Sequence, residues 1–226
     1  MSEENKIRLE EIGVQANSNL KTIHVAREEA LTVSRELIRN AANSIRATHR
    51  ADYKEAHILI TKVRNLASRF DPIRDAYPSV YYGGYVEDAL KEYAEASIAL
   101  AIAEQTVIPG PEDLGINAAP YLNGLAEVIG ELRRAILDEL RKDEFTRCEE
   151  LLETMDDIYT ILVTIDYPDA VTRGLRRSTD VARSILERTR GDLTLSIRQH
   201  KLESMLSEVQ YNNCLLYTSP SPRDRG

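Results

Sequence analysis

The segment KEYAEASIAL, residues 91–100, places two glutamates three residues apart in a run of mostly small and apolar residues. In an α-helix Glu92 and Glu95 lie one above the other on the same face, and Asp88 extends that face by one turn. Mg²⁺ and Mn²⁺ prefer oxygen ligands, so this acidic face is a candidate half of a metal site. A solvated helix face without a bound ion is the alternative, and the spacing alone does not exclude it.

A metal site built on this face needs further acidic residues from other segments. Glu131 occurs in VIGELRR, and Asp156 and Asp157 occur in LLETMDDIYTIL. Both aspartates lie beside an apolar helical stripe, from which a side chain can reach a groove between helices. Each of these acids, taken alone, is also typical of ordinary surface charge.

The charge distribution supports an acidic centre between two basic flanks, although the whole chain carries a formal net charge of −8. Residues 35–75 contain nine Lys/Arg against five Asp/Glu, and residues 173–201 contain eight against three. Residues 87–157 contain eighteen acidic side chains against six basic ones. This layout would allow phosphates to contact the flanks while a cation binds the middle.

The elements that position these residues are predicted to be helices throughout, because apolar residues recur at three- and four-residue steps. No convincing strand pattern or hairpin turn is present, and prolines mark the joints between the helices. Gly83-Gly84 is either a flexible loop or the late start of a helix. The predicted helices cover about residues 5–48, 51–69, 79–106, 120–141, 143–164 and 168–208.

Composition is typical of a soluble globular protein. Its 226 residues are 42% hydrophobic and 29% charged, without an apolar run long enough to cross a membrane. The acidic start MSEENKIRLEEIG is not expected to be a secretory signal. Two cysteines without CxxC spacing are typical of a reducing compartment, and we expect a cytoplasmic protein.

The C-terminal segment 212–226 differs from the rest of the chain. It loses helical periodicity and contains the string LLYTSPSPRD, which looks like translated sequencing-adapter sequence. We therefore predict one helical domain over residues 1–211 and a non-native, disordered tail over 212–226.

Several segments together resemble the translin/TRAX family in its prokaryotic, archaeal-type branch. REEALTVSRELIRNA, KEYAEA, PYLNGLAEVIGELRR, LLETMDDIY and GLRRSTDVARSILERTRGDLTLSIRQHKLE occur in the order that the family has. The resemblance covers about residues 20–203, and its last segment is the most specific. It implies a single-domain bundle of about six to seven helices, with long first and last helices, that assembles into a closed homo-oligomeric shell.

The resemblance also implies a function. Family members bind single-stranded RNA and DNA, and TRAX-type members are metal-dependent endoribonucleases that use an acidic Glu-Tyr-x-Glu pair. Glu92-Tyr93-Ala94-Glu95 matches this pair, and Asp157 aligns with the third catalytic acid better than Asp156 does. Glu131 matches a Gly-Glu-Leu motif of the family, with a role in metal binding or in pairing with an arginine. The implied cofactor is Mg²⁺ or Mn²⁺, held by Glu92, Glu95, Glu131 and Asp157.

One departure from the translin-type pattern concerns nucleic-acid binding. Translin-type chains carry basic residues just before the acidic helix, whereas YYGGYVED has none. We expect phosphate contacts from the two basic flanks instead, although surface solubility would also explain these residues: Arg46, Arg50, Lys54, Arg64, Arg176, Arg177 and Arg183. No histidine lies near the acidic motifs in sequence, so none is expected to act as a base.

Three functions remain open from the sequence. The first is a metal-dependent endoribonuclease with single-stranded nucleic acid, RNA or DNA, as its partner. The second is a non-catalytic RNA- or DNA-binding protein of the translin type. The third is a helical oligomeric scaffold whose acidic face is merely solvated.

Overall fold

The computed structural model describes residues 2–217, and the side chains of residues 2–209. Every regular element in this part of the chain is a helix, which confirms the all-α prediction. Six long helices form the bundle: α1 (Glu3–His49), α2 (Tyr53–Ala67), α5 (Gly84–Ala103), α7 (Ala118–Leu140), α8 (Phe145–Val163) and α10 (Leu175–Tyr217). None of the described helices has the length and apolar character needed to cross a bilayer.

Short helices fill the joints that the prolines mark. They are η1 (Ser68–Phe70), α3 (Asp71–Ala76), α4 (Pro78–Tyr81), α6 (Pro111–Leu114) and α9 (Asp169–Thr172). Gly83 adopts an extended conformation and caps α5, so Gly84 marks the late start of a helix. The predicted helix over 79–106 is therefore two helices, and the last long helix begins at Leu175 instead of residue 168.

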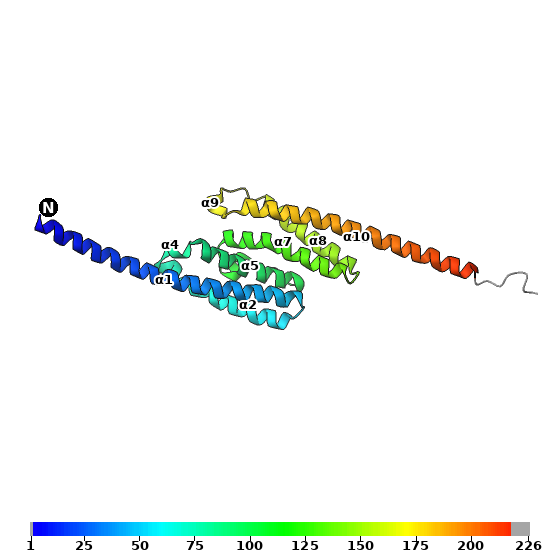
Figure 1. Ribbon diagram of the computed structural model, residues 1–226, viewed down its shortest axis with the longest axis horizontal. Helices are drawn as coiled ribbons and strands as arrows, with labels where there is room; N and C mark the ends of the chain where they lie inside the picture. Colours follow the sequence, from blue (N-terminus) through cyan, green and yellow to red (C-terminus); the bar gives the residue numbers. More distant parts are fainter. Residues whose placement is uncertain (1, 218–226) are drawn as a thin grey trace, which may run out of the picture.

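The α5 helix is the central element of the bundle. It packs against α1 and α2 on one side and against α7 on the other, while α7 in turn contacts α8 and α10 (Figure 1). All residues from Tyr93 to Ile102 are buried, because helices cover α5 on nearly every side. A charged side chain on this part of α5 consequently lies inside the protein.

Both long terminal helices extend beyond the bundle in opposite directions (Figure 1). Residues 3–22 of α1 are exposed, and so are residues 198–209 of α10. The α10 helix continues to Tyr217, which lies inside the segment 212–226 that the composition sets apart. Residues 218–226 lie outside the described part of the chain, and the domain boundary at residue 211 stays a prediction.

Candidate metal and nucleic-acid site

Three glutamates from two helices converge at the contact between α5 and α7. Glu92 and Glu95 come from α5 and Glu127 comes from α7, and one carboxylate oxygen from each lies within 4.8 Å of the other two. A set of three carboxylates matches the oxygen donors that hard divalent cations prefer. The cluster therefore offers three ligand atoms to a metal ion.

A close contact between helices allows this convergence. Gly124 of α7 lies so near α5 that a Cβ atom there would be 2.6 Å from the carbonyl oxygen of Lys91 and 2.8 Å from the Cβ of Ala94. Glu127 follows Gly124 by three residues and lies on the same face of α7. The missing side chain of Gly124 thus lets the carboxylate of Glu127 reach those on α5.

Burial makes the negative charge of the cluster costly. Glu95 is only 7% exposed, and burial raises the pKa of its carboxyl to about 8, with the charges of Glu92 and Glu127 adding to the effect. The pKa of Glu92 is also raised, chiefly by burial. A divalent cation would compensate this charge, so the donor set fits a metal ion both in chemistry and in electrostatics.

Lys91 supplies one positive charge inside the cluster. Its ammonium donates to Glu127 at 2.7 Å and lies 3.8 Å from Glu92. One lysine cannot balance three carboxylates, which agrees with the raised pKa of Glu95. Tyr93, between the two glutamates of α5, faces the opposite way and accepts a hydrogen bond from Arg64 Nε at 3.1 Å.

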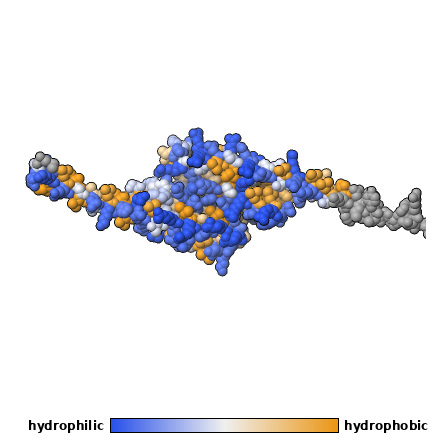
Figure 2. All heavy atoms as spheres, viewed as in Figure 1, coloured by the Kyte–Doolittle hydropathy of each residue, from blue (hydrophilic) through white to orange (hydrophobic). Residues whose placement is uncertain are grey.

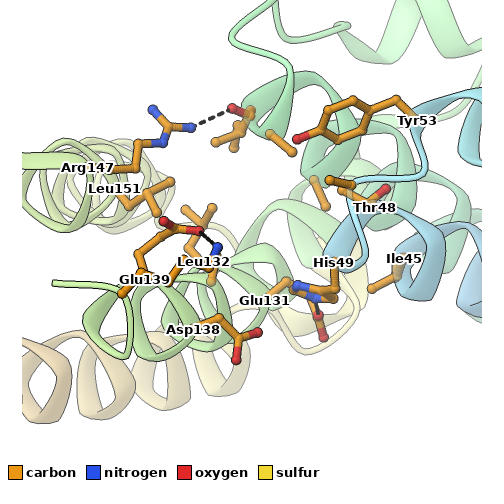
Figure 3. A pocket seen from close by; sticks show the side chains of 16 residues that line it. Ile45, Thr48, His49, Tyr53, Glu131, Leu132, Asp138, Glu139, Arg147 and Leu151 are labelled. Carbon is orange, nitrogen blue, oxygen red and sulfur yellow. Dashed lines mark hydrogen bonds and ion pairs between the residues drawn. The ribbon is translucent and has the colours of Figure 1, made fainter. Parts of the chain in front are cut away.

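Glu131, one turn beyond Glu127, has a partner of its own. It forms a 2.5 Å hydrogen bond with His49 Nε2 at the end of α1, and this bond holds the pKa of Glu131 below its usual value (Figure 3). The two residues line a cavity of about 160 Å³ near the α1–α2 and α7–α8 joints. Glu131 is not among the three clustered carboxylates, although its charge still contributes to the raised pKa of Glu95.

Asp157 does not join the cluster. It is exposed on α8, and within the described residues its carboxylate is not one of the three that converge. Its neighbour Asp156 forms an ion pair with Arg190 of α10 at 2.8 Å. The assignment of Asp157 as the third acid therefore stays a prediction, while the geometry favours Glu127.

The predicted phosphate contacts separate into two groups. Arg46, Arg50, Lys54 and Arg64 are exposed on α1, its C-terminal cap and α2. Arg177 lines a groove of about 570 Å³ together with Glu95 and Glu127. Arg176 and Arg183 are exposed outside this groove and form ion pairs with Asp166 and Glu187. Only Arg177 of this set thus lies beside the acidic cluster.

Sequence reasoning missed Glu127 in the cluster and His49, the partner of Glu131 beside it. Glu127 carried a usable signal, because it lies on the same helical face as Glu131 and three residues after a glycine. His49 carried none, because 82 residues separate it from the glutamate that it contacts.

Known proteins resemble this chain in sequence and in fold. No family model matches the chain. A protein from Methanocaldococcus jannaschii, described as uncharacterized protein MJ0175, is 34% identical over 185 residues, which are 81% of this chain and 82% of that protein. The solved complex of AfC3PO with duplex RNA is 34% identical with a TM-score of 0.76 and covers 85% of this chain and 97% of the other.

A further solved structure, apo-NeC3PO, is 22% identical with a TM-score of 0.73, covers 80% of this chain and 95% of the other, and shares the fold. The fold and the relatives define an all-α protein of the C3PO class. The chain belongs to the translin/TRAX family as an archaeal-type member.

Proposed function

We propose that this protein is a metal-dependent endoribonuclease that hydrolyses phosphodiester bonds at the α5–α7 contact. The observation that carries the proposal is the convergence of Glu92, Glu95 and Glu127 within 4.8 Å at a groove that also contains arginine. Mg²⁺ or Mn²⁺ is the proposed cofactor, because all three donors are carboxylates.

Each residue has a distinct part in the reaction. The three glutamates would hold the cation, which supplies positive charge to the phosphate and lowers the pKa of water. Glu95 is the most buried of them, so it would hold the cation from the side of the site that solvent reaches least. Lys91 orients Glu127 through its 2.7 Å hydrogen bond and keeps a positive charge beside the incoming phosphate. Asp157 and Glu131 are not needed in this arrangement.

RNA is the proposed substrate class. AfC3PO, which shares 34% identity and nearly its full length with this chain, was solved in complex with duplex RNA. The resemblance to the family also implies single-stranded RNA or DNA. The sequence and the groove give no base-specific contact, so we propose that the strand is recognised through its phosphates and its shape.

Assembly into a homo-oligomer is part of the proposal. Large apolar side chains are exposed along the extension of α1, among them Ile7, Leu9, Ile12, Val14 and Leu20. The extension of α10 exposes Leu202, Met205, Leu206 and Val209 (Figure 2). Exposed apolar surface of this kind is typical of contacts with other protein chains, and a second copy is the proposed partner.

A cleavage assay with matched variants tests the enzymatic proposal. Labelled single-stranded RNA, duplex RNA and single-stranded DNA would each be incubated with Mg²⁺, Mn²⁺ or EDTA. Wild type and an exposed control on α8, Glu153→Gln, should cleave RNA only with metal, whereas Glu95→Gln and Glu127→Gln should be at least 100-fold slower, as about 3 kcal/mol of lost transition-state stabilisation implies.

Two outcomes of this assay decide between the open alternatives. Cleavage by Glu127→Gln at the wild-type rate, together with its loss in Asp157→Asn, would return the role of third acid to Asp157. Tight RNA binding without cleavage in any condition would show that the protein is a non-catalytic binding protein. Absence of RNA binding even at low salt would leave the helical scaffold as the remaining function.

A further inference from the structure

The groove that Glu95 and Glu127 line also contains two arginines. The glutamates come from α5 and α7, and Arg173 and Arg177 come from the joint between α9 and α10. A phosphodiester brought to the acidic side would meet repulsion unless positive charge faced it. Arginine is suited to this task, because its planar fork binds two phosphate oxygens at once.

Arg173 is held in an uncommon backbone conformation. Its φ is 54° and its ψ is 47°, in the left-handed region, and Gly174 follows with a φ of 89°. A non-glycine residue in this region costs roughly 1–2 kcal/mol. The Nε atom of Arg173 lies 3.1 Å from a carboxylate oxygen of Glu87 on α5, and this ion pair stabilises the turn and orients the guanidinium. Arg173 also lines a second groove with Glu87 and Lys91.

Asn123 on α7 holds the joint between α9 and α10 against α7. Its buried side-chain amide donates to the carbonyl oxygen of Thr172 at 2.8 Å, and its side-chain oxygen accepts from the Ser178 hydroxyl at 2.9 Å. These bonds fall on either side of Arg173 and Arg177. Asn123 precedes Glu127 by one turn of α7, so the two arginines keep a set position relative to the cluster.

Arg177 differs from its neighbour Arg176 in a way that points to a ligand. Both arginines are exposed, but Arg176 forms an ion pair with Asp166 at 3.8 Å. Arg177 lines the groove, and among residues 2–209 no hydrogen bond or ion pair of its side chain is found. Its five N–H donors are thus available to an anion that enters the groove.

We propose that Arg173 and Arg177 form a binding site for one backbone phosphate of the nucleic acid, in the groove that Glu95 and Glu127 line. This proposal rests on the proposed function for its choice of ligand. Glu87 acts through Arg173, so it is a positioning residue. The site contributes to affinity in EDTA as well, because its charges come from the protein alone.

Binding measurements in EDTA test the site without any cleavage. The probe is a fluorescent, uncleavable 2′-O-methyl RNA oligonucleotide, titrated at several salt concentrations. Arg177→Gln should weaken binding about tenfold, as expected for the loss of one charged hydrogen bond, and should reduce the slope of log K against log salt by about 1. Arg190→Gln removes an exposed arginine of the same helix that is paired with Asp156 at 2.8 Å, and this variant should bind like wild type.

Arg173 requires a different substitution, because alanine would be strained at a φ of 54°. Arg173→Gly keeps the left-handed turn accessible and removes the guanidinium. We expect it to weaken binding to a similar degree, with an unchanged circular dichroism spectrum, and Glu87→Gln should weaken binding less.

Equal affinities for the Arg190 and Arg177 variants, whether both weakened or both unchanged, would overturn the phosphate site. That result is separate from failure of the proposed function, which would appear as cleavage that survives Glu95→Gln and Glu127→Gln. A binding difference without any cleavage would keep the site and reject the nuclease.

Discussion

Gly124 on α7 lies directly against the backbone of Glu95 on α5, and a Cβ atom at Gly124 would be 3.1 Å from the Glu95 nitrogen. The nearest atoms are mainly backbone, which cannot rotate away as a flexible side chain could. The position of the acidic cluster therefore depends on a residue that carries no functional group.

Gly124→Ala is expected to separate α5 from α7. The added methyl group would lie 2.6 Å from the Lys91 carbonyl oxygen, so the helices must shift, and overpacking of this kind costs about 1–3 kcal/mol of unfolding free energy. The rate of RNA cleavage and the stabilisation by metal should also fall, because the shift moves Glu127 away from the glutamates of α5. Chemical denaturation and the cleavage assay measure the two effects.

Gly130→Ala on the same helix is the matched control. No atom lies within 4 Å of a Cβ at this position, and alanine favours the helix by about 0.5–1 kcal/mol. It should stabilise the protein and leave cleavage intact. If Gly124→Ala behaved like this control, the close contact would not determine the geometry of the cluster.

Glu95→Gln is expected to stabilise the protein while it abolishes cleavage. The pKa of Glu95 is raised to about 8 in the fold, so ionising this residue disfavours the folded state increasingly from about pH 4.5 to pH 8. Glutamine removes this penalty. Because one pKa unit corresponds to about 1.4 kcal/mol, we expect a gain of about 2–4 kcal/mol at pH 9 in EDTA and almost none at pH 4.

Denaturation at both pH values, in EDTA, measures this difference. Glu153→Gln, an exposed control, should show no pH-dependent gain. Mg²⁺ or Mn²⁺ should raise the unfolding free energy of wild type more at pH 9 than at pH 6, because a cation competes with the proton on Glu95. A gain for Glu95→Gln that is the same at pH 4 and pH 9 would show that its charge is not the cause.

Glu131→Gln should destabilise the protein at neutral pH by about 1–3 kcal/mol, because it breaks a partly buried charged hydrogen bond to His49. The pKa of Glu131 is lowered in the fold, so the stabilisation that its charge contributes is present above its unfolded pKa. It should disappear as the pH falls through the lower folded value.

Denaturation at pH 7 and at successively lower pH checks this dependence. RNA cleavage by Glu131→Gln, measured where the protein is folded, should stay within about threefold of wild type, as about 0.6 kcal/mol corresponds to. A loss of cleavage rate as large as that expected for Glu127→Gln would show that Glu131 is a metal ligand.

Deletion of residues 2–22 should change assembly without unfolding the bundle. These residues extend beyond the bundle and contribute nothing to its buried core. We expect an unchanged unfolding midpoint for the isolated subunit and a lower particle mass by light scattering. A particle of unchanged size would show that the exposed apolar side chains of this segment do not join subunits.

The fold was largely predictable because helical periodicity is a local signal. Six long helices were expected, and six are found at nearly the expected positions. The short helices α3, α4, α6 and α9 were missed, since four to six residues give too few turns for periodicity to show. Gly83-Gly84 left two options, and the extended N-cap at Gly83, with α5 beginning at Gly84, decides for the late helix start.

Two of the three glutamates in the candidate cluster were predictable from the sequence. Glu92 and Glu95 share one helix, so their three-residue spacing is enough to put them on one face. Glu127 comes from a helix whose rotation and distance depend on packing at Gly124. The glycine is visible in the sequence, but it does not specify which helix packs against it. Asp157 was chosen by its match to a motif, which carries no information about which helices touch.

The two hydrogen bonds that join the buried Asn123 side chain to Thr172 and Ser178 have a consequence for substrate choice. They join α7 to the joint between α9 and α10 before any strand arrives, so little entropy remains to be lost when one is bound. Selectivity among nucleic acids should then depend on how readily each strand bends to fit the preformed groove. Flexible strands should bind better than stiff ones, without recognition of individual bases.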